Sequence, residues 1–179
     1  MKFAARLVIG LSLAVASPVF AAAPAPAAPL AASNAAHRKA VQDLLGAMQI
    51  EKVVKGVAAR SRYPNEAQKQ AALAKLDKIP PAEMYQRLAP ALTGAISAET
   101  AIEMNRFYNT PYGKQLIYKK YNAGAQLIMP GATKAVPPEE KKERKRPAYV
   151  KASQELDEAE PVIEHEAFKL LQLINKEKR

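Results

Sequence analysis

Basic side chains form the densest group of chemically active residues in this chain. Five positive charges fall within six positions, at Lys141, Lys142, Arg144, Lys145 and Arg146. Such a cluster can hold phosphate groups or an anionic membrane leaflet, at roughly 1 kcal/mol per charge near the surface. A run of charges is also typical of a solvated loop or of the first turn of a helix. Both interpretations stay open from the sequence.

A second group interleaves aromatic and basic residues over a short distance. Its members are Lys114, Tyr118, Lys119, Lys120 and Tyr121. Lys114 and Tyr118 are four positions apart, so a helix places them on one face. Such a face can stack on an anionic ligand and neutralise it. The alternative is that the tyrosines are half-buried and the lysines solvated. We treat both groups as candidate anionic contacts.

Groups that support catalysis or metal binding are sparse. The two histidines, His37 and His165, are far apart in the sequence and lack the spacing of metal ligands. The chain has no cysteine, no glycine-rich phosphate loop and no Gly-x-Ser-x-Gly motif. We therefore expect no metal, no cofactor and no enzymatic activity. A hydrolase that uses a pair of carboxylates ranks last among the functional interpretations.

The first residues are typical of a secretory signal peptide. Lys2 and Arg6 form a short positive segment before an apolar run of about ten residues. A membrane-spanning helix needs roughly 20 apolar residues, so this run is too short to be one. Val19 and Ala21 then supply the small residues of a cleavage site. We expect a signal peptide over 1–21, an Ala/Pro-rich tether over 22–33, and export into a bacterial periplasm.

The charge balance favours anionic partners. Removal of residues 1–21 leaves 25 basic and 17 acidic residues, a balance that suits phospholipid head groups or lipopolysaccharide. Nucleic acid is not expected as a partner. No disulfide can form without cysteine, even in an oxidising compartment, so the stability of the domain must come from burial.

Apolar residues recur with a helical period through most of the chain. The stripe Val41–Met48 repeats over Ile50–Val57 after a slip in phase, which predicts two helices with a break between them. Caps or prolines predict further helix starts near Asn65, Ala82 and Ser97. No segment alternates with the period of a strand. The sequence predicts an all-α, compact bundle of about six to seven helices, with a core domain over 34–130 and no sheet.

A tight corner between two helices is predicted around residue 110. The motif consists of Phe107, Tyr108, Thr110, Pro111, Gly113 and Lys114. Thr110 is suited to an N-cap, Pro111 to the first helical position, and Gly113 to close approach of another helix. From Phe107 to Lys114, and over roughly 37–128, the chain resembles the bacterial family catalogued as domain of unknown function 2059. The resemblance implies an exported, all-helical domain and brings no established activity.

The segment 147–179 predicts a long amphipathic helix that packs on the core, after a Pro/basic linker over 131–146. Its apolar seam comprises Ala152, Leu156, Ala159, Ile163, Ala167, Leu170 and Ile174. Pro161 either kinks this helix or begins a second one. Apolar surface off the seam comes from Val162, Phe168 and Leu173, the candidate partner contacts.

Two functional hypotheses follow for this basic, helical protein. The first is a non-enzymatic interaction module of the bacterial cell envelope that binds another envelope protein. The alternative is binding of an anionic or amphiphilic small ligand, such as a lipid or glycan fragment, between helices. A cavity of several hundred cubic ångströms with converging polar groups favours the alternative. An exposed apolar stripe on a solid bundle favours the first.

Overall fold

Every regular element in the described part of the chain is an α-helix. The computed structural model describes residues 28–122 and 136–177. Its helices are α1 (Ala28–Ala47), α2 (Ile50–Arg60), α3 (Glu66–Asp77), α4 (Pro81–Leu92), α5 (Ala98–Tyr108), α6 (Pro111–Asn122), α7 (Pro138–Glu143) and α8 (Pro147–Lys176). The all-α prediction is confirmed, with one helix more than expected in the described residues because residues 138–143 of the predicted linker form α7.

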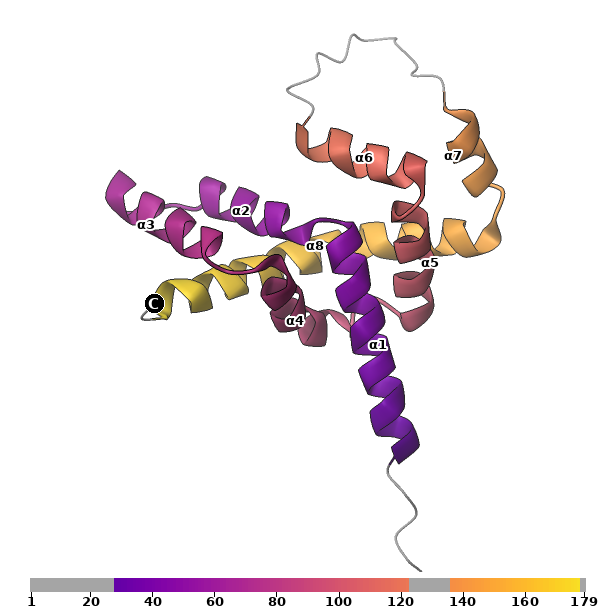
Figure 1. Ribbon diagram of the computed structural model, residues 1–179, viewed down its shortest axis with the longest axis horizontal. Helices are drawn as coiled ribbons and strands as arrows, with labels where there is room; N and C mark the ends of the chain where they lie inside the picture. Colours follow the sequence, from indigo (N-terminus) through magenta and orange to yellow (C-terminus); the bar gives the residue numbers. More distant parts are fainter. Residues whose placement is uncertain (1–27, 123–135, 178–179) are drawn as a thin grey trace, which may run out of the picture.

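The long helix α8 runs the length of the molecule and contacts α2, α3, α4 and α5 (Figure 1). Helix α1 packs against α4 and α5. The predicted seam of α8 is buried from Ala152 to Ile174, because residues at this spacing form one stripe along the helix. Pro161 lies inside α8 without ending it. The proline therefore does not begin a second helix.

The break between α1 and α2 lies where the apolar phase slips. Gln49 has a left-handed backbone with φ of 52°, an uncommon conformation for a side chain other than glycine. Its amide nitrogen donates to the Gly46 carbonyl at 3.0 Å, which closes the turn. Val41, Leu44 and Ile50 are fully buried on either side of it.

Helix starts agree with the predicted caps at Asn65 and Ser97. The Asn65 side chain accepts a hydrogen bond from the Gln68 amide at 2.9 Å, and Ser97 accepts one from Thr100. α1 differs, since it begins at Ala28 and not after Ser33 or Asn34. The tether expected over 22–33 is therefore helical in its last residues.

Several sequence-based predictions concern residues outside the described part. These are the signal peptide over 1–21, the start of the tether at 22–27, and the parts of the core domain and linker that lie within 123–135. Within the described residues, no helix is both long enough and apolar enough to cross a membrane.

A carboxylate from α8 completes the N-terminus of α5. Glu155 accepts hydrogen bonds from the Ser97 amide at 2.6 Å, the Ser97 hydroxyl at 3.1 Å and the Thr100 hydroxyl at 2.7 Å. Negative charge is favourable at this end of a helix. Burial opposes the charge on Glu155, but these three donors outweigh it and lower the pKa of the carboxyl. Glu155 thus fixes α5 on α8 through polar contacts beside the apolar seam.

The corner between α5 and α6 leaves no room for a side chain at Gly113. A Cβ atom there would lie 2.1 Å from the Phe107 carbonyl oxygen and 2.7 Å from the Tyr108 Cα. Thr110 links the two helices, since its hydroxyl donates to that same carbonyl at 2.7 Å and accepts from the Gly113 amide at 3.0 Å. This contact sets the direction in which α6 leaves α5.

We predict that Gly113→Ala destabilises the fold by about 1–3 kcal/mol, because backbone atoms of α5 must move to admit the methyl group. Thr110→Ala should cost about 1 kcal/mol as a lost cap. Gly94→Ala is the matched control, since no atom lies within 4 Å of a Cβ at that position. Urea unfolding measures all three, and equal stability of the Gly113 and Gly94 variants would contradict the close-approach interpretation.

Candidate functional site

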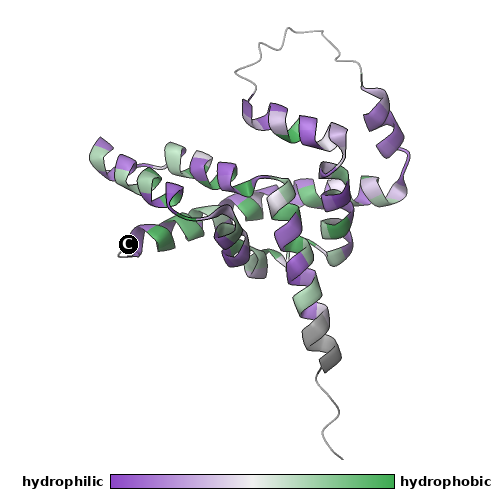
Figure 2. Ribbon diagram, in the orientation of Figure 1, coloured by the Kyte–Doolittle hydropathy of each residue, from purple (hydrophilic) through white to green (hydrophobic). Residues whose placement is uncertain are grey.

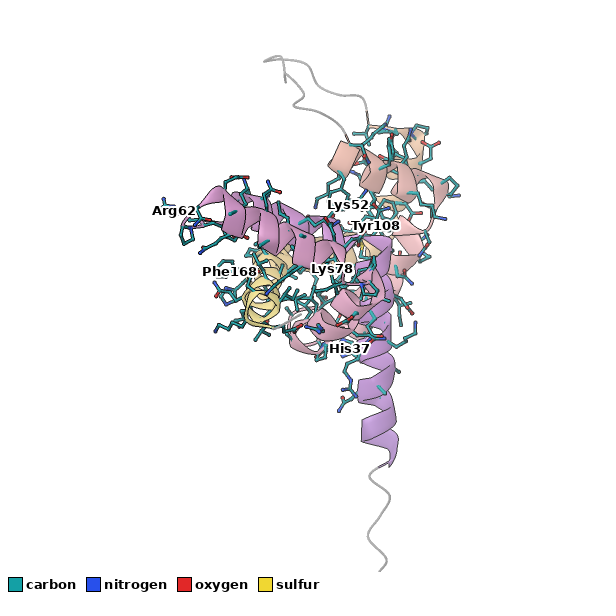
Figure 3. The ribbon with its side chains drawn as sticks, turned by 60° about the vertical axis from the view of Figure 1, so that its left-hand side comes forward. His37, Lys52, Arg62, Lys78, Tyr108 and Phe168 are labelled. Atoms are coloured by element: carbon teal, nitrogen blue, oxygen red, sulfur yellow. The ribbon has the colours of Figure 1, made fainter. Side chains whose placement is uncertain are left out.

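A cleft of about 360 Å³ lies between α2, α6 and α8, within the size range of small-molecule sites. We call it the α2–α6–α8 cleft. Its lining residues are Met48, Ile50, Lys52, Val53, Gly56, Arg60, Tyr108, Lys120, Tyr121, Leu156, Asp157, Glu160, Ile163 and Glu164. Figure 3 shows Lys52 and Tyr108 close together beneath α6.

The floor of the cleft is apolar and belongs to the core. Ile50, Leu156 and Ile163 are buried, and Val53 packs against them while keeping part of its surface exposed. Gly56 leaves space in the wall of α2, because a Cβ there would meet only the flexible end of Arg60, at 3.4 Å. The cleft can therefore receive an apolar group without rearranging the backbone.

Two tyrosine hydroxyls reach the cleft from different helices. The Tyr121 hydroxyl donates to the Met48 carbonyl at 3.0 Å, which holds the end of α6 on the α1–α2 junction. The Tyr108 hydroxyl has no hydrogen-bond partner among the described residues. Burial raises the pKa of both phenols, with Tyr121 at about 12, and nearby carboxylates including Glu160 add to the effect. Both therefore stay protonated at neutral pH, and Tyr108 keeps a proton to donate.

The charges in the cleft balance. Its three basic residues, Lys52, Arg60 and Lys120, face three acidic ones, Asp157, Glu160 and Glu164. Two ion pairs, Arg60–Glu164 and Lys120–Glu160, are long at 3.3 Å and exposed, so each contributes little to stability and exchanges readily.

Two charged groups of the cleft have no ion-pair partner among the described residues. The Lys52 ammonium lies 5.2 Å from the centroid of the Tyr121 ring, a cation–π distance. Asp157 lies near enough to Tyr108 for its charge to help raise the pKa of that phenol. One cation and one carboxylate are therefore available to a ligand, beside a free phenol hydroxyl.

The cleft offers an apolar floor together with cations, carboxylates and a phenol hydroxyl as binding groups. No group of three or more metal-ligating side chains occurs within 28–122 and 136–177. Outside the cleft, Glu103 and Glu143 share two arginines. Hydrogen bonds from Arg106 and Arg146 outweigh the effect of burial and lower the pKa of both acids. An acid with a lowered pKa is a poor proton donor at neutral pH.

The basic run at Lys141–Arg146 separates into two kinds of residue. Arg146 contacts Glu103 at 2.6 Å and Glu143 at 2.9 Å, and Arg106 contacts the same two acids at 2.8 and 2.5 Å. We call these four residues the ionic ring. It joins α5, α7 and the start of α8.

Further contacts hold α7 in place beside the ionic ring. Arg144 binds Glu140, which also accepts from the Tyr112 hydroxyl of α6 at 2.8 Å. The three lysines of the run, Lys141, Lys142 and Lys145, are exposed and have no ion-pair partner in the described chain. The run is therefore neither a wholly solvated loop nor a uniform patch.

The second candidate group divides between two faces of α6. Lys120 and Tyr121 line the cleft, whereas Lys114 and Tyr118 lie on the outer face, with Tyr118 66% exposed. Lys119 borders a separate groove between α6 and α7. Of the corner motif, Phe107 is buried against the rings of Tyr108, Tyr112 and Tyr149, which makes its role structural.

The candidate partner contacts on α8 are exposed but do not form one patch. Val162, Phe168 and Leu173 lie off the seam as predicted. At 100° per residue, Val162 and Leu173 fall on one flank of the helix, and Phe168 falls on the other. Leu173 borders a groove between α4 and α8.

Sequence reasoning missed most of the cleft. Lys52, Gly56 and Arg60 recur every four residues, so they share a face of α2. Asp157, Glu160 and Glu164 likewise follow one flank of the α8 seam. These local spacings were readable in the sequence, but nothing in it indicated that the two faces meet under α6.

We predict that the ionic ring makes stability depend on pH in the acid range. The carboxylates of Glu103 and Glu143 contribute stability above their ordinary pKa of 4.5, and it is lost as the pH falls through the lowered folded values. Glu143→Gln should flatten this pH dependence because it removes one of the two carboxylates. Arg106→Gln should also flatten it, because it removes a hydrogen-bond donor that lowers the pKa of both. Urea unfolding between pH 7 and about pH 3 tests it. A wild-type pH dependence in both variants would rule out the ring as its source.

Comparisons with known proteins found no relative of this chain. No protein-family model matches the chain, and no curated protein and no solved structure matches it either. The resemblance to the family of unknown function 2059 therefore stays a prediction from the motif around Thr110-Pro111.

Proposed function

We propose that this chain is an exported, non-enzymatic helical protein of the bacterial cell envelope that binds an amphiphilic small ligand in the α2–α6–α8 cleft. The observation that supports this best is the coincidence of an apolar floor with three unsatisfied polar groups. Lys52, Asp157 and the Tyr108 hydroxyl converge on one cavity without forming ion pairs or hydrogen bonds among the described residues. Ligand sites typically combine a mainly apolar lining with a few such groups.

The balanced charges refine the class of ligand. A purely anionic ligand would meet Asp157, Glu160 and Glu164 as well as the three cations. A ligand that carries both an ammonium and an acidic group satisfies Asp157 and Lys52 together, while its hydrocarbon part covers Ile50 and Ile163. We therefore favour a zwitterionic amphiphile, such as a lipid fragment with an amine and a phosphate.

Export and the absence of catalysis are part of this proposal. Its support is the sequence, namely the leader over 1–21 and the scarcity of catalytic motifs. Binding of an envelope protein through α8 remains the second hypothesis. The separation of Phe168 from Val162 and Leu173 weakens it, because a stable interface needs a contiguous apolar centre.

We predict that filling the cleft abolishes ligand binding without unfolding the protein. Gly56→Leu places a side chain into open space in the cleft wall and improves helix propensity. Titration calorimetry with single-chain amphiphiles below their critical micelle concentrations measures the effect. Zwitterionic head groups should bind more tightly than anionic or cationic ones of equal chain length, and Gly56→Leu should weaken binding by at least about tenfold.

Gly94→Leu serves as the matched control, because Gly94 lies outside the cleft with no atom within 4 Å of a Cβ. Tyr108→Phe removes only the free hydroxyl and should weaken binding while leaving the melting temperature nearly unchanged. Equal affinity of the Gly56 and Gly94 variants would exclude the cleft as the site. Failure of every amphiphile to bind the wild-type protein would overturn the proposed function.

A further inference from the structure

The net positive charge of the molecule is concentrated at one end. Residues 111–122 and 136–151, which cover α6, α7 and the start of α8, contain nine basic and three acidic residues. The rest of the described chain contains 13 basic and 14 acidic residues and is close to neutral. Figure 1 shows α6 and α7 together at the top of the molecule, and Figure 2 shows α7 hydrophilic along its length.

The ion pairs decide which of these charges a partner can reach. Arg144 and Arg146 are exposed but already form ion pairs with Glu140, Glu143 and Glu103 of this chain. The basic residues at this end that make no ion pair in the described chain are all lysines. Lys151 acts on Glu155, whose pKa its charge helps to lower, and the other five are Lys114, Lys119, Lys141, Lys142 and Lys145. Among its acids, Glu139 alone makes no ion pair in the described chain. We call these five lysines the lysine surface.

The arginines fix the helices that carry the lysine surface. The ionic ring holds α7 on α5, and the hydrogen bond between Tyr112 and Glu140 holds α7 on α6. The lysines therefore project from an ordered platform. A single exposed aromatic ring, Tyr118, lies one turn from Lys114 on the same face of α6.

We propose that the lysine surface docks this protein on an anionic phospholipid membrane. Clusters of four to eight basic residues bind acidic head groups through additive point charges. Tyrosine suits the same boundary, since its ring enters the head-group layer while its hydroxyl stays hydrated.

The chemistry of this end favours a lipid surface over nucleic acid. The arginines, which recognise phosphates in a bidentate manner, are occupied by carboxylates. Tyr118 is the one exposed aromatic residue within 111–122 and 136–151, whereas single strands are held on several stacking platforms. This docking is independent of the cleft, because none of the five lysines lines it.

Vesicle co-sedimentation with the full chain tests the proposal. Vesicles of phosphatidylglycerol mixed with phosphatidylcholine should retain the protein at low salt, and vesicles of phosphatidylcholine alone should not. Replacing Lys114, Lys119, Lys141 and Lys142 with Gln should lower the partition coefficient about fivefold per lysine. Binding should also fall as salt shortens the screening length below about 10 Å.

The matched control replaces four exposed basic residues outside this end, Arg38, Arg62, Lys78 and Lys176. Figure 3 shows Arg62 and Lys78 apart from α6. The control has the same net charge as the lysine variant and should keep nearly all binding. Both variants should keep the wild-type melting temperature, because exposed unpaired charges contribute little to stability.

Three results would overturn the docking proposal. The first is an equal loss of binding in the two charge variants, which would indicate a general effect of net charge. The second is tighter binding of a single-stranded oligonucleotide than of the acidic vesicles at equal salt, which would assign the surface to nucleic acid. The third is a failure of the wild-type protein to bind acidic vesicles even at low salt.

Tyr118→Ser should reduce mainly the binding that persists at high salt.

Discussion

The apolar seam of α8 is the contact on which the rest of the structure depends. The chain has no cysteine, so no covalent crosslink supports the fold, and four helices lie against this one element. Burial of apolar surface contributes about 25 cal/mol per Å², and the seam from Ala152 to Ile174 presents it without interruption. Polar contacts then set the orientation of each neighbour, as Glu155 does for α5.

A second constraint, the backbone contact at Gly113, determines where a site can form. It directs α6 away from α5 so that Tyr121 reaches the Met48 carbonyl, and the cleft is the space enclosed below. The same helix carries Lys114 and Tyr118 on its opposite face. One short element therefore separates a zwitterionic interior cleft from a cationic outer surface.

Local spacing predicted the helices because an apolar period and a cap both act within a few residues. It predicted the break between the first two helices near Met48, the caps at Asn65 and Ser97, and the seam of α8. It did not predict that α8 continues through Pro161, since burial on both sides of the proline decides this. The linker interpretation of 131–146 was incomplete, because α7 depends on Arg106 of α5 and on Tyr112 of α6. The cleft depends on three helices separated in sequence, which no single periodicity reveals.

The position of α8 in the sequence has a consequence for folding. Its partners α2 to α5 all precede it, and the contact between Ser97 and Glu155 spans 58 residues. Contacts of high sequence separation slow folding, because the loop must close before burial rewards it. Helix α1 can pack against α4 and α5 before α8 is made, but the contacts of α2, α3, α4 and α5 with α8 form only once the last helix is complete. That order of events suits the proposed export, since an exported chain crosses the membrane before it folds.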